Sequence, residues 1–150
     1  MDPLDNLYRE QRAPMVRLAH LLTGSNLVAQ DLVHDAFVKI GPRLDGLDNP
    51  GGYLRRMVVN ECRMWLRHGA VEQRHQRAER EPVALPPELD EMWTALACLP
   101  GRQRIALVCR YYEDLTVDEI ADVLDCPAGT VKSLIHRGLA LLREVIDDAD

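Results

Sequence analysis

Hydrophobic side chains recur every three or four residues along most of the chain, which is the period of an amphipathic helix. The clearest run lies between residues 29 and 40, where the apolar side chains share one face and Gly41-Pro42 follows. Its members are Ala29, Leu32, Val33, Ala36, Phe37 and Ile40. No segment shows the alternating pattern of a half-buried strand. The sequence therefore predicts an all-α fold.

The first half of the chain is predicted to hold three helices. Pro14 is expected to split or kink the first of them, because proline has no backbone N–H to donate. Residues 45–52, DGLDNPGG, are rich in turn formers and predict a loop before the third helix. The predicted helices cover residues 4–22, from about 26 to 40, and from the end of that loop to about 68.

The second half predicts four more helices. Thr116 and Glu119 have the spacing of a capping box at the start of one of them. Between the two halves the periodicity weakens, and charged residues and prolines accumulate. The predicted helices cover residues 88–98, 101–112, 117–124 and 127 to about 146. The sequence thus predicts two small helical domains, at 1–68 and 88–150, joined by a flexible linker at 69–87.

The charge is unevenly distributed. The formal net charge of the whole chain is −6, which argues against a protein that coats nucleic acid generally. Residues 1–50 carry −2, residues 51–85 carry +3 and residues 86–150 carry −7. The net charge therefore hides a basic middle segment between two acidic ones.

Four cysteines are scattered without the spacing of a metal site or of a disulfide framework. We therefore expect no metal and no cofactor, and cysteines that are buried thiols in a reducing cytosol. The first residues lack the apolar stretch of a signal peptide, and no apolar run approaches the length that crosses a bilayer. These features predict a cytoplasmic protein with no membrane insertion.

The last two predicted helices have the proportions of a helix-turn-helix. The stretch between Cys126 and Arg143 contains Lys132, His136 and Arg137 but no carboxylate. Such a helix offers polar groups to base edges and cations to phosphates, so it is predicted to recognise DNA rather than to be an ordinary solvated face. The buried side is expected to comprise Val131, Ile135, Gly138 and Leu142, extended by Leu139.

Another polar face lies on the helix predicted for residues 26–40. Asp31, His34, Asp35 and Val38 share it, which leaves a branched apolar residue among acids. A carboxylate pair can serve acid–base catalysis, but no nucleophile, metal set or phosphate loop accompanies this one, so an enzyme is not predicted. A protein-docking face and a plain solvated face remain almost equally supported.

The third predicted helix has a basic side. Arg56, Asn60, Arg63 and Arg67 share that side, and Tyr53 stands near the preceding loop. Such a face can hold unpaired bases by charge and stacking. Taken alone, the pattern favours the simpler interpretation, a solvated arginine face with Tyr53 in the core.

Three stretches resemble the extracytoplasmic-function (ECF) sigma factors, in particular the short SigE-like actinobacterial type. They are HLLTGSNLVAQDLVHDAF at 20–37, YLRRMVVN at 53–60 and LPGRQRIALVCRYYEDLTVDEIADVLDCPAGTVKS at 99–133. The resemblance implies a sigma factor that binds core RNA polymerase and directs promoter-specific transcription initiation. Residues 1–68 would be region 2, a three-helix bundle, and residues 88–150 would be region 4, a four-helix helix-turn-helix domain.

The resemblance also implies roles for individual residues. The residues implied to dock on the β′ clamp helices of the core enzyme are Asp31, Asp35 and Val38. Melting and reading of the −10 element falls to Asn49, Tyr53, Arg56, Asn60 and Arg63. Reading of the −35 element falls to Thr130, Lys132, Ser133, His136 and Arg137. The implied partners are the β′ clamp helices and β flap of the polymerase, promoter DNA, and an anti-sigma factor or other regulator.

Two positions depart from the family pattern. His34 stands where glutamine is usual, and Leu134 stands where a polar residue is usual beside the −35 bases. Leu134 is expected either to pack in the core or to touch a thymine methyl group. Two alternative functions remain: an autonomous helix-turn-helix regulator, which would need a dimer surface, and a degenerate sigma-like decoy that binds core or an antagonist.

Overall fold

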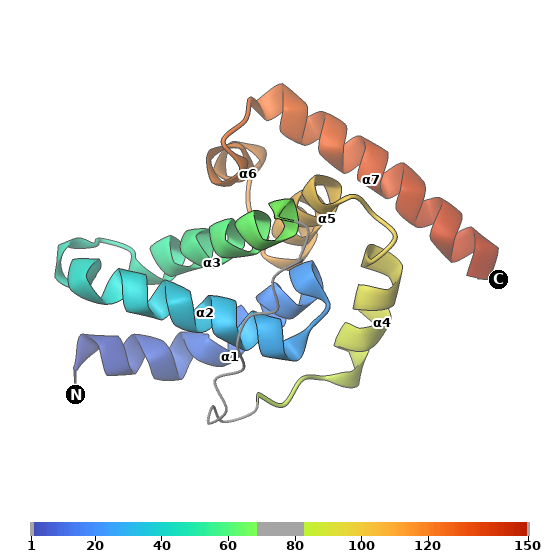
Figure 1. The fold of residues 1–150 in the computed structure, drawn as a ribbon. Helices are drawn as coiled ribbons and strands as arrows, with labels where there is room; N and C mark the ends of the chain where they lie inside the picture. The colour runs from blue at the N-terminus through green and yellow to red at the C-terminus, as the bar shows by residue number, and fades with distance from the viewer. Residues whose placement is uncertain (1, 69–82, 150) are drawn as a thin grey trace. The chain divides into compact units, whose positions relative to one another are not determined.

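The chain divides into two compact units, Met1–Pro86 and Pro87–Asp150 (Figure 1). The computed structural model describes residues 2–68 and 83–149. Within those ranges there is no strand, so the all-α prediction is confirmed. Most of the predicted linker falls on residues 69–82, which lie outside the described residues.

The first unit is built from α1 (Pro3–Thr23), α2 (Asn26–Ile40) and α3 (Pro50–Arg67). Each of these helices packs against the other two, and Figure 1 shows them side by side. Their apolar faces meet in a core with fully buried side chains. These include Leu18, Leu22, Leu32, Ile40, Leu54 and Val58.

The helix α1 runs through Pro14 as one element, so the predicted split does not occur. A proline removes a single backbone hydrogen bond. Immediately after it, Met15 and Val16 are buried, and this packing holds the helix together. The helix ends at Gly24, which has a left-handed φ of 77° and donates its N–H to the His20 carbonyl at 2.8 Å.

The segment between α2 and α3 is more ordered than predicted. A 3₁₀ helix, η1, covers Gly41–Gly46, and α3 already begins at Pro50, so the predicted loop at 45–52 is wrong for most of its length. Leu44 is buried and anchors η1 to the core. Asn49 caps α3, because its Oδ1 accepts a hydrogen bond from the Gly52 N–H at 3.1 Å.

The predicted linker is anchored at its C-terminal end. Val83 is buried, and its carbonyl accepts a hydrogen bond from Asn26 Nδ2 at 3.5 Å. Asn26 Oδ1 in turn accepts from Gln30 Nε2 at 2.9 Å. The chain is therefore attached to α2 before the second unit begins.

The second unit contains five elements, of which the fourth confirms the predicted capping box. Thr116 accepts from the Glu119 N–H, and the Glu119 carboxylate accepts from the Thr116 N–H. The elements are α4 (Pro87–Leu96), α5 (Gly101–Leu107), the π-helical turn η2 (Val108–Tyr112), α6 (Val117–Leu124) and α7 (Ala128–Ala149).

Arg104 is a charged residue inside the second unit. It donates from Nε to the Leu96 carbonyl at 3.1 Å and from Nη2 to the Leu99 carbonyl at 3.0 Å. Its guanidinium also lies 4.8 Å from the centroid of the Trp93 ring, a cation–π distance. Burial lowers the pKa of the Arg104 guanidinium. These contacts satisfy the carbonyls of the last residue of α4 and of the turn after it, and they attach that helix to α5.

The four cysteines differ in how exposed they are. All four cysteines have free thiols, but the prediction that they are buried holds only for Cys62 and Cys109. Cys126 is half-buried, and Cys98 is exposed just after α4 ends. No group of three or more metal-ligating side chains occurs among the described residues. None of the described helices is long and apolar enough to cross a membrane.

Gly138 allows α7 to pack closely on α5, and this generates a test. A Cβ atom at Gly138 would lie 3.0 Å from Leu107 Cδ1, and Leu107 is itself buried. We expect Gly138→Ala to lower the free energy of unfolding by about 1–2 kcal/mol in urea titrations, because Leu107 must shift within a packed core.

Gly129→Ala is the matched control, because a Cβ there meets nothing within 4 Å. It lies on the same helix, and alanine is the better helix former, so we expect a gain of up to about 1 kcal/mol. Equal effects of the two substitutions would contradict the close packing at Gly138.

Candidate functional site

The turn between α6 and α7 is short and specified by backbone geometry. Asp125 ends α6 in the left-handed conformation, with φ 52° and ψ 54°. The Cys126 N–H donates to the Ala121 carbonyl at 3.0 Å, and the Val131 N–H donates to the Pro127 carbonyl at 3.2 Å. Because α6 also packs against α7, the pair forms the predicted helix-turn-helix.

The first turns of α7 present a basic, acid-free face to solvent. Lys132, Ser133, His136 and Arg137 are all exposed, as reading of DNA by this face requires. Thr130, the fifth residue predicted there, is half-buried. The structure thus places all five predicted −35 residues in consecutive turns of one helix.

Leu134 belongs to the core of the second unit. Its side chain is only 8% exposed, and Val131 and Gly138 are buried on the same side of α7. Ile135, Leu139 and Leu142, which were also predicted for the buried side, are half-buried instead. The buried stripe of α7 is therefore rotated toward Leu134 relative to the prediction, and the thymine-contact alternative for Leu134 is not supported.

The predicted −10 residues gather on α3. Tyr53 and Arg63 are half-buried, and Arg56 and Asn60 are exposed. Arg63 donates from Nη2 to Asn60 Oδ1 at 2.9 Å, which holds these two side chains together one turn apart.

Two of these residues already have structural partners. Asn49 uses its Oδ1 to cap α3, so this oxygen is occupied in the free chain. Tyr53 accepts a hydrogen bond at its hydroxyl from Arg43 Nη1, at 2.8 Å. Arg43 was not among the predicted residues, because only tertiary structure brings η1 to the start of α3.

The predicted docking residues on α2 are not equally accessible. Val38 is 61% exposed and Asp35 is half-buried, but Asp31 is only 8% exposed. The prediction that Asp31 lies on the exposed face is therefore wrong. Helical spacing shows which side of α2 is opposite its apolar face. It does not show whether other segments of the chain cover that opposite side.

Leu27 is a surface residue that the sequence reasoning missed. It is 58% exposed, although it is a large apolar side chain in the first turn of α2. Leu27, Asp31, His34 and Val38 follow one another at spacings of four, three and four residues. That is the heptad spacing with which helices pack in coiled coils. The signal in the sequence was an apolar residue on the otherwise polar face.

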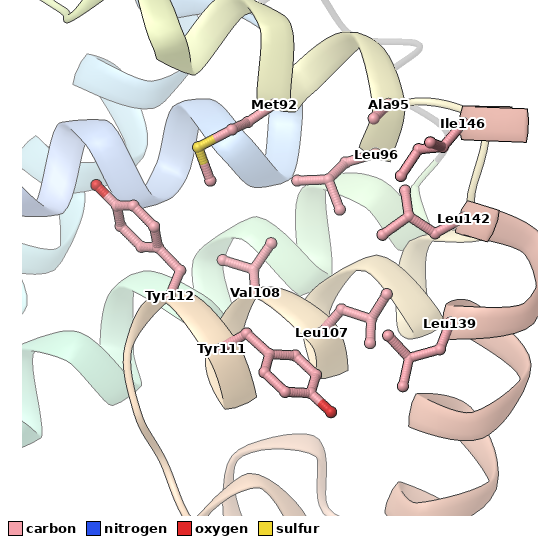
Figure 2. A pocket seen from close by; sticks show the side chains of 10 residues that line it. All are labelled: Met92, Ala95, Leu96, Leu107, Val108, Tyr111, Tyr112, Leu139, Leu142 and Ile146. Atoms are coloured by element: carbon pink, nitrogen blue, oxygen red, sulfur yellow. The ribbon is translucent and has the colours of Figure 1, made fainter. Parts of the chain in front are cut away.

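The second unit also carries an apolar groove of about 360 Å³ (Figure 2). It is formed by α4, by α5 with η2, and by the C-terminal half of α7. Three of the lining side chains, Met92, Tyr111 and Ile146, are large and exposed. The other lining residues are Ala95, Leu96, Leu107, Val108, Tyr112, Leu139 and Leu142.

The π-helical turn shapes one wall of this groove. The Glu113 N–H donates to the Val108 carbonyl at 3.1 Å, five residues back, where an α-helix would use the fourth. Figure 2 shows Tyr111 and Tyr112 projecting from this turn. Since π turns are rare and often occur at functional sites, the groove is a further candidate interface.

Comparison with known proteins identifies both units. Residues 7–71 match the family described as Sigma-70 region 2, and residues 89–142 match Sigma-70, region 4. An RNA polymerase sigma-E factor from Streptomyces avermitilis is 32% identical over 152 aligned residues, which span 95% of this chain and 84% of the relative. The chain belongs to the ECF sigma factors of the sigma-70 family. It directs transcription initiation, as the resemblance implied.

Other relatives agree with this sigma factor assignment. The ECF RNA polymerase sigma factor SigE of Mycolicibacterium smegmatis is 31% identical over 97% of this chain and 62% of its own length. A co-crystal structure of the sigma factor RpoE with the anti-sigma factor NepR, from Bartonella quintana, has the same fold. It superposes with a TM-score of 0.71 at 22% identity, over 95% of this chain and 97% of that one.

The burial of Leu134 generates a prediction. We expect Leu134→Arg to lower the free energy of unfolding of this sigma factor by about 2–4 kcal/mol in urea titrations, because a charged group would enter the core. Ser133→Arg is the control, because Ser133 is exposed on the same turn and its replacement should change stability by less than about 0.5 kcal/mol. A stable Leu134→Arg protein with altered −35 preference would contradict the core assignment.

Proposed function

We propose that the two units share promoter recognition, each pairing a DNA-reading face with a polymerase-docking surface. The first unit reads unpaired −10 DNA with α3 and docks on the β′ clamp helices with α2. The second unit reads the −35 element with α7 and docks on the β flap with its groove. The observation that carries the proposal is the exposed, acid-free face at the start of α7 in a strongly acidic unit.

Contact with the −35 element follows from the side chains of α7. Lys132 and Arg137 are cations at the edge of the face and suit phosphates, which position a helix on the duplex. Ser133 and His136 lie between them and suit hydrogen bonds to base edges in the major groove. Leu134, buried beneath this face, sets its orientation.

Contact with the −10 element is assigned to α3, where cations stand beside an aromatic ring. Proteins hold unpaired bases by combining a positive groove with aromatic stacking. Arg56 supplies exposed positive charge, and the half-buried Tyr53 supplies the ring. Asn60 is held by Arg63 and presents an amide to the bases.

Docking of the first unit is supported by exposed apolar side chains at heptad spacing on α2. Leu27 and Val38 are apolar and exposed at its two ends, and His34 lies between them. Asp31, which shares this spacing, is buried and is left out of the proposed contact. Exposed apolar side chains at heptad positions are those through which helices pack in coiled coils. The β′ clamp helices, themselves a coiled coil, are a partner of matching geometry.

Docking of the second unit is assigned to the groove. Exposed apolar side chains around a concavity are typical of a site that receives a partner helix. The β flap of the core enzyme is the partner that the resemblance implies. The Bartonella protein was crystallised with an anti-sigma factor, and we expect a regulator of that kind to inhibit this chain by covering the same docking surfaces.

The net charge fits a factor that acts only within the holoenzyme. With a net charge of −6 and few basic side chains on the α7 face, the free protein has little attraction for random duplex DNA. Polymerase would then supply the remaining affinity. We expect the protein to act in the cytoplasm, with no catalytic step of its own.

Run-off transcription tests this function directly. Core RNA polymerase is supplied with a pool of duplex templates randomised at −10 and −35, with and without this protein. We expect transcripts from a defined subset of templates only when the protein is present, because core enzyme alone does not select promoters. Binding to core without initiation would favour the decoy, and palindromic binding by the free protein would favour the autonomous regulator.

Substitutions separate docking from DNA reading. Val38→Asp places a charge on an exposed apolar contact, so we expect its affinity for core to fall on the order of ten-fold, measured by fluorescence anisotropy. The combined variant Lys132→Ala/Arg137→Ala should bind core normally but transcribe the selected promoters poorly at raised salt. Loss of core binding by the second variant would show that α7 serves docking instead.

A further inference from the structure

Arg43 is not among the residues proposed to dock on the polymerase or to contact DNA, yet it contacts Tyr53 of the proposed −10 site. It is exposed on η1, and its Nη1 donates a hydrogen bond to the hydroxyl oxygen of Tyr53 at 2.8 Å. Ten residues of sequence separate the two side chains. A cationic donor makes a stronger hydrogen bond than a neutral one, so this contact restrains the Tyr53 ring.

Both partners stand on ordered backbone. On one side, Pro42 precedes Arg43 and fixes the backbone at the start of η1, while the buried Leu44 follows it. On the other side, Tyr53 lies in the first turn of α3, which Asn49 caps. The hydrogen bond therefore joins two fixed points and sets the direction of the ring.

The charge of Arg43 also remains available to a ligand. Asp45 and Asp48 are exposed in the same segment, but neither forms an ion pair with Arg43 in the described part of the chain. A guanidinium carries several N–H donors, and only the one on Nη1 is used by Tyr53. The others can pair with the phosphate of a nucleotide whose base stacks on the ring.

We propose that Arg43 is a positioning and strand-holding residue for the unpaired −10 strand. It holds the Tyr53 ring in the orientation that receives a base, and it pairs with the phosphate of that nucleotide. Side-by-side aromatic and cationic groups are the combination that single-stranded nucleic acid sites use. This inference rests on the proposed function, since it requires that α3 meets unpaired promoter DNA.

The test uses holoenzyme assembled from core RNA polymerase and the full chain. The probe is a single-stranded oligonucleotide that spans the −10 element of a promoter selected from the randomised pool. Its affinity is measured at several salt concentrations for five proteins besides the unsubstituted one. These are Arg43→Ala, Arg43→Lys, Tyr53→Phe, Arg43→Ala/Tyr53→Phe and the control Arg9→Ala, an exposed arginine on α1.

We expect Arg43→Ala to weaken binding about ten-fold and to reduce the slope of log affinity against log salt by about 0.7, the value for one phosphate contact on a single strand. Arg43→Lys should keep the slope but lose part of the affinity, because lysine cannot reproduce the fixed geometry of the guanidinium. Arg9→Ala should match the unsubstituted protein in both measurements.

Coupling between the two residues distinguishes positioning from simple charge. If Arg43 acts through the Tyr53 hydroxyl, the double variant should lose less affinity than the product of the two single losses. Fully multiplicative losses, or an Arg43→Ala protein that matches Arg9→Ala, would overturn the proposal. Failure of the unsubstituted holoenzyme to initiate at any template would instead overturn the proposed function, so the two failures are separable.

Discussion

The packing of α7 against α5 and α6 is the constraint on which the functional surfaces of the second unit depend. Close approach at Gly138 and burial of Val131 and Leu134 set the rotation of α7 about its axis. That rotation turns the basic side chains of the first turns toward solvent. Further along the same helix, it turns Leu142 and Ile146 toward the groove. One buried stripe thus orients both the proposed DNA-reading face and one wall of the groove.

In the first unit, the two proposed surfaces lie on two different helices. The proposed docking face lies on the outer side of α2, and the proposed −10 face is the basic side of α3. An ion pair between Lys39 on α2 and Glu61 on α3 joins the two helices beside Val38. Because α2 and α3 pack against each other, a polymerase docked on α2 would hold α3 at a defined place.

The candidate site follows from the sequence to different degrees. The acid-free stretch of α7 and the basic side of α3 are visible as patterns, since charge and helical period are properties of the chain itself. Three features are not visible. They are the burial of Asp31, the contact between Arg43 and Tyr53, and the groove beside η2. Each depends on packing between segments that are distant in sequence, or on a helix that changes its hydrogen-bonding pattern.

The sequence by itself determined the number and order of the helices, the capping box at Thr116 and the resemblance to two sigma regions, because these depend on local spacing and on composition. Tertiary structure decided which borderline residues are buried. Leu134 lies at the margin of the apolar stripe, and only the neighbouring α5 and α6 place it in the core. Residues 45–52 look like a loop, yet Leu44 and the Asn49 cap order much of that segment. The local sequence pattern predicts which residues share a helix face. Whether those residues are buried depends on which other segments pack against that face.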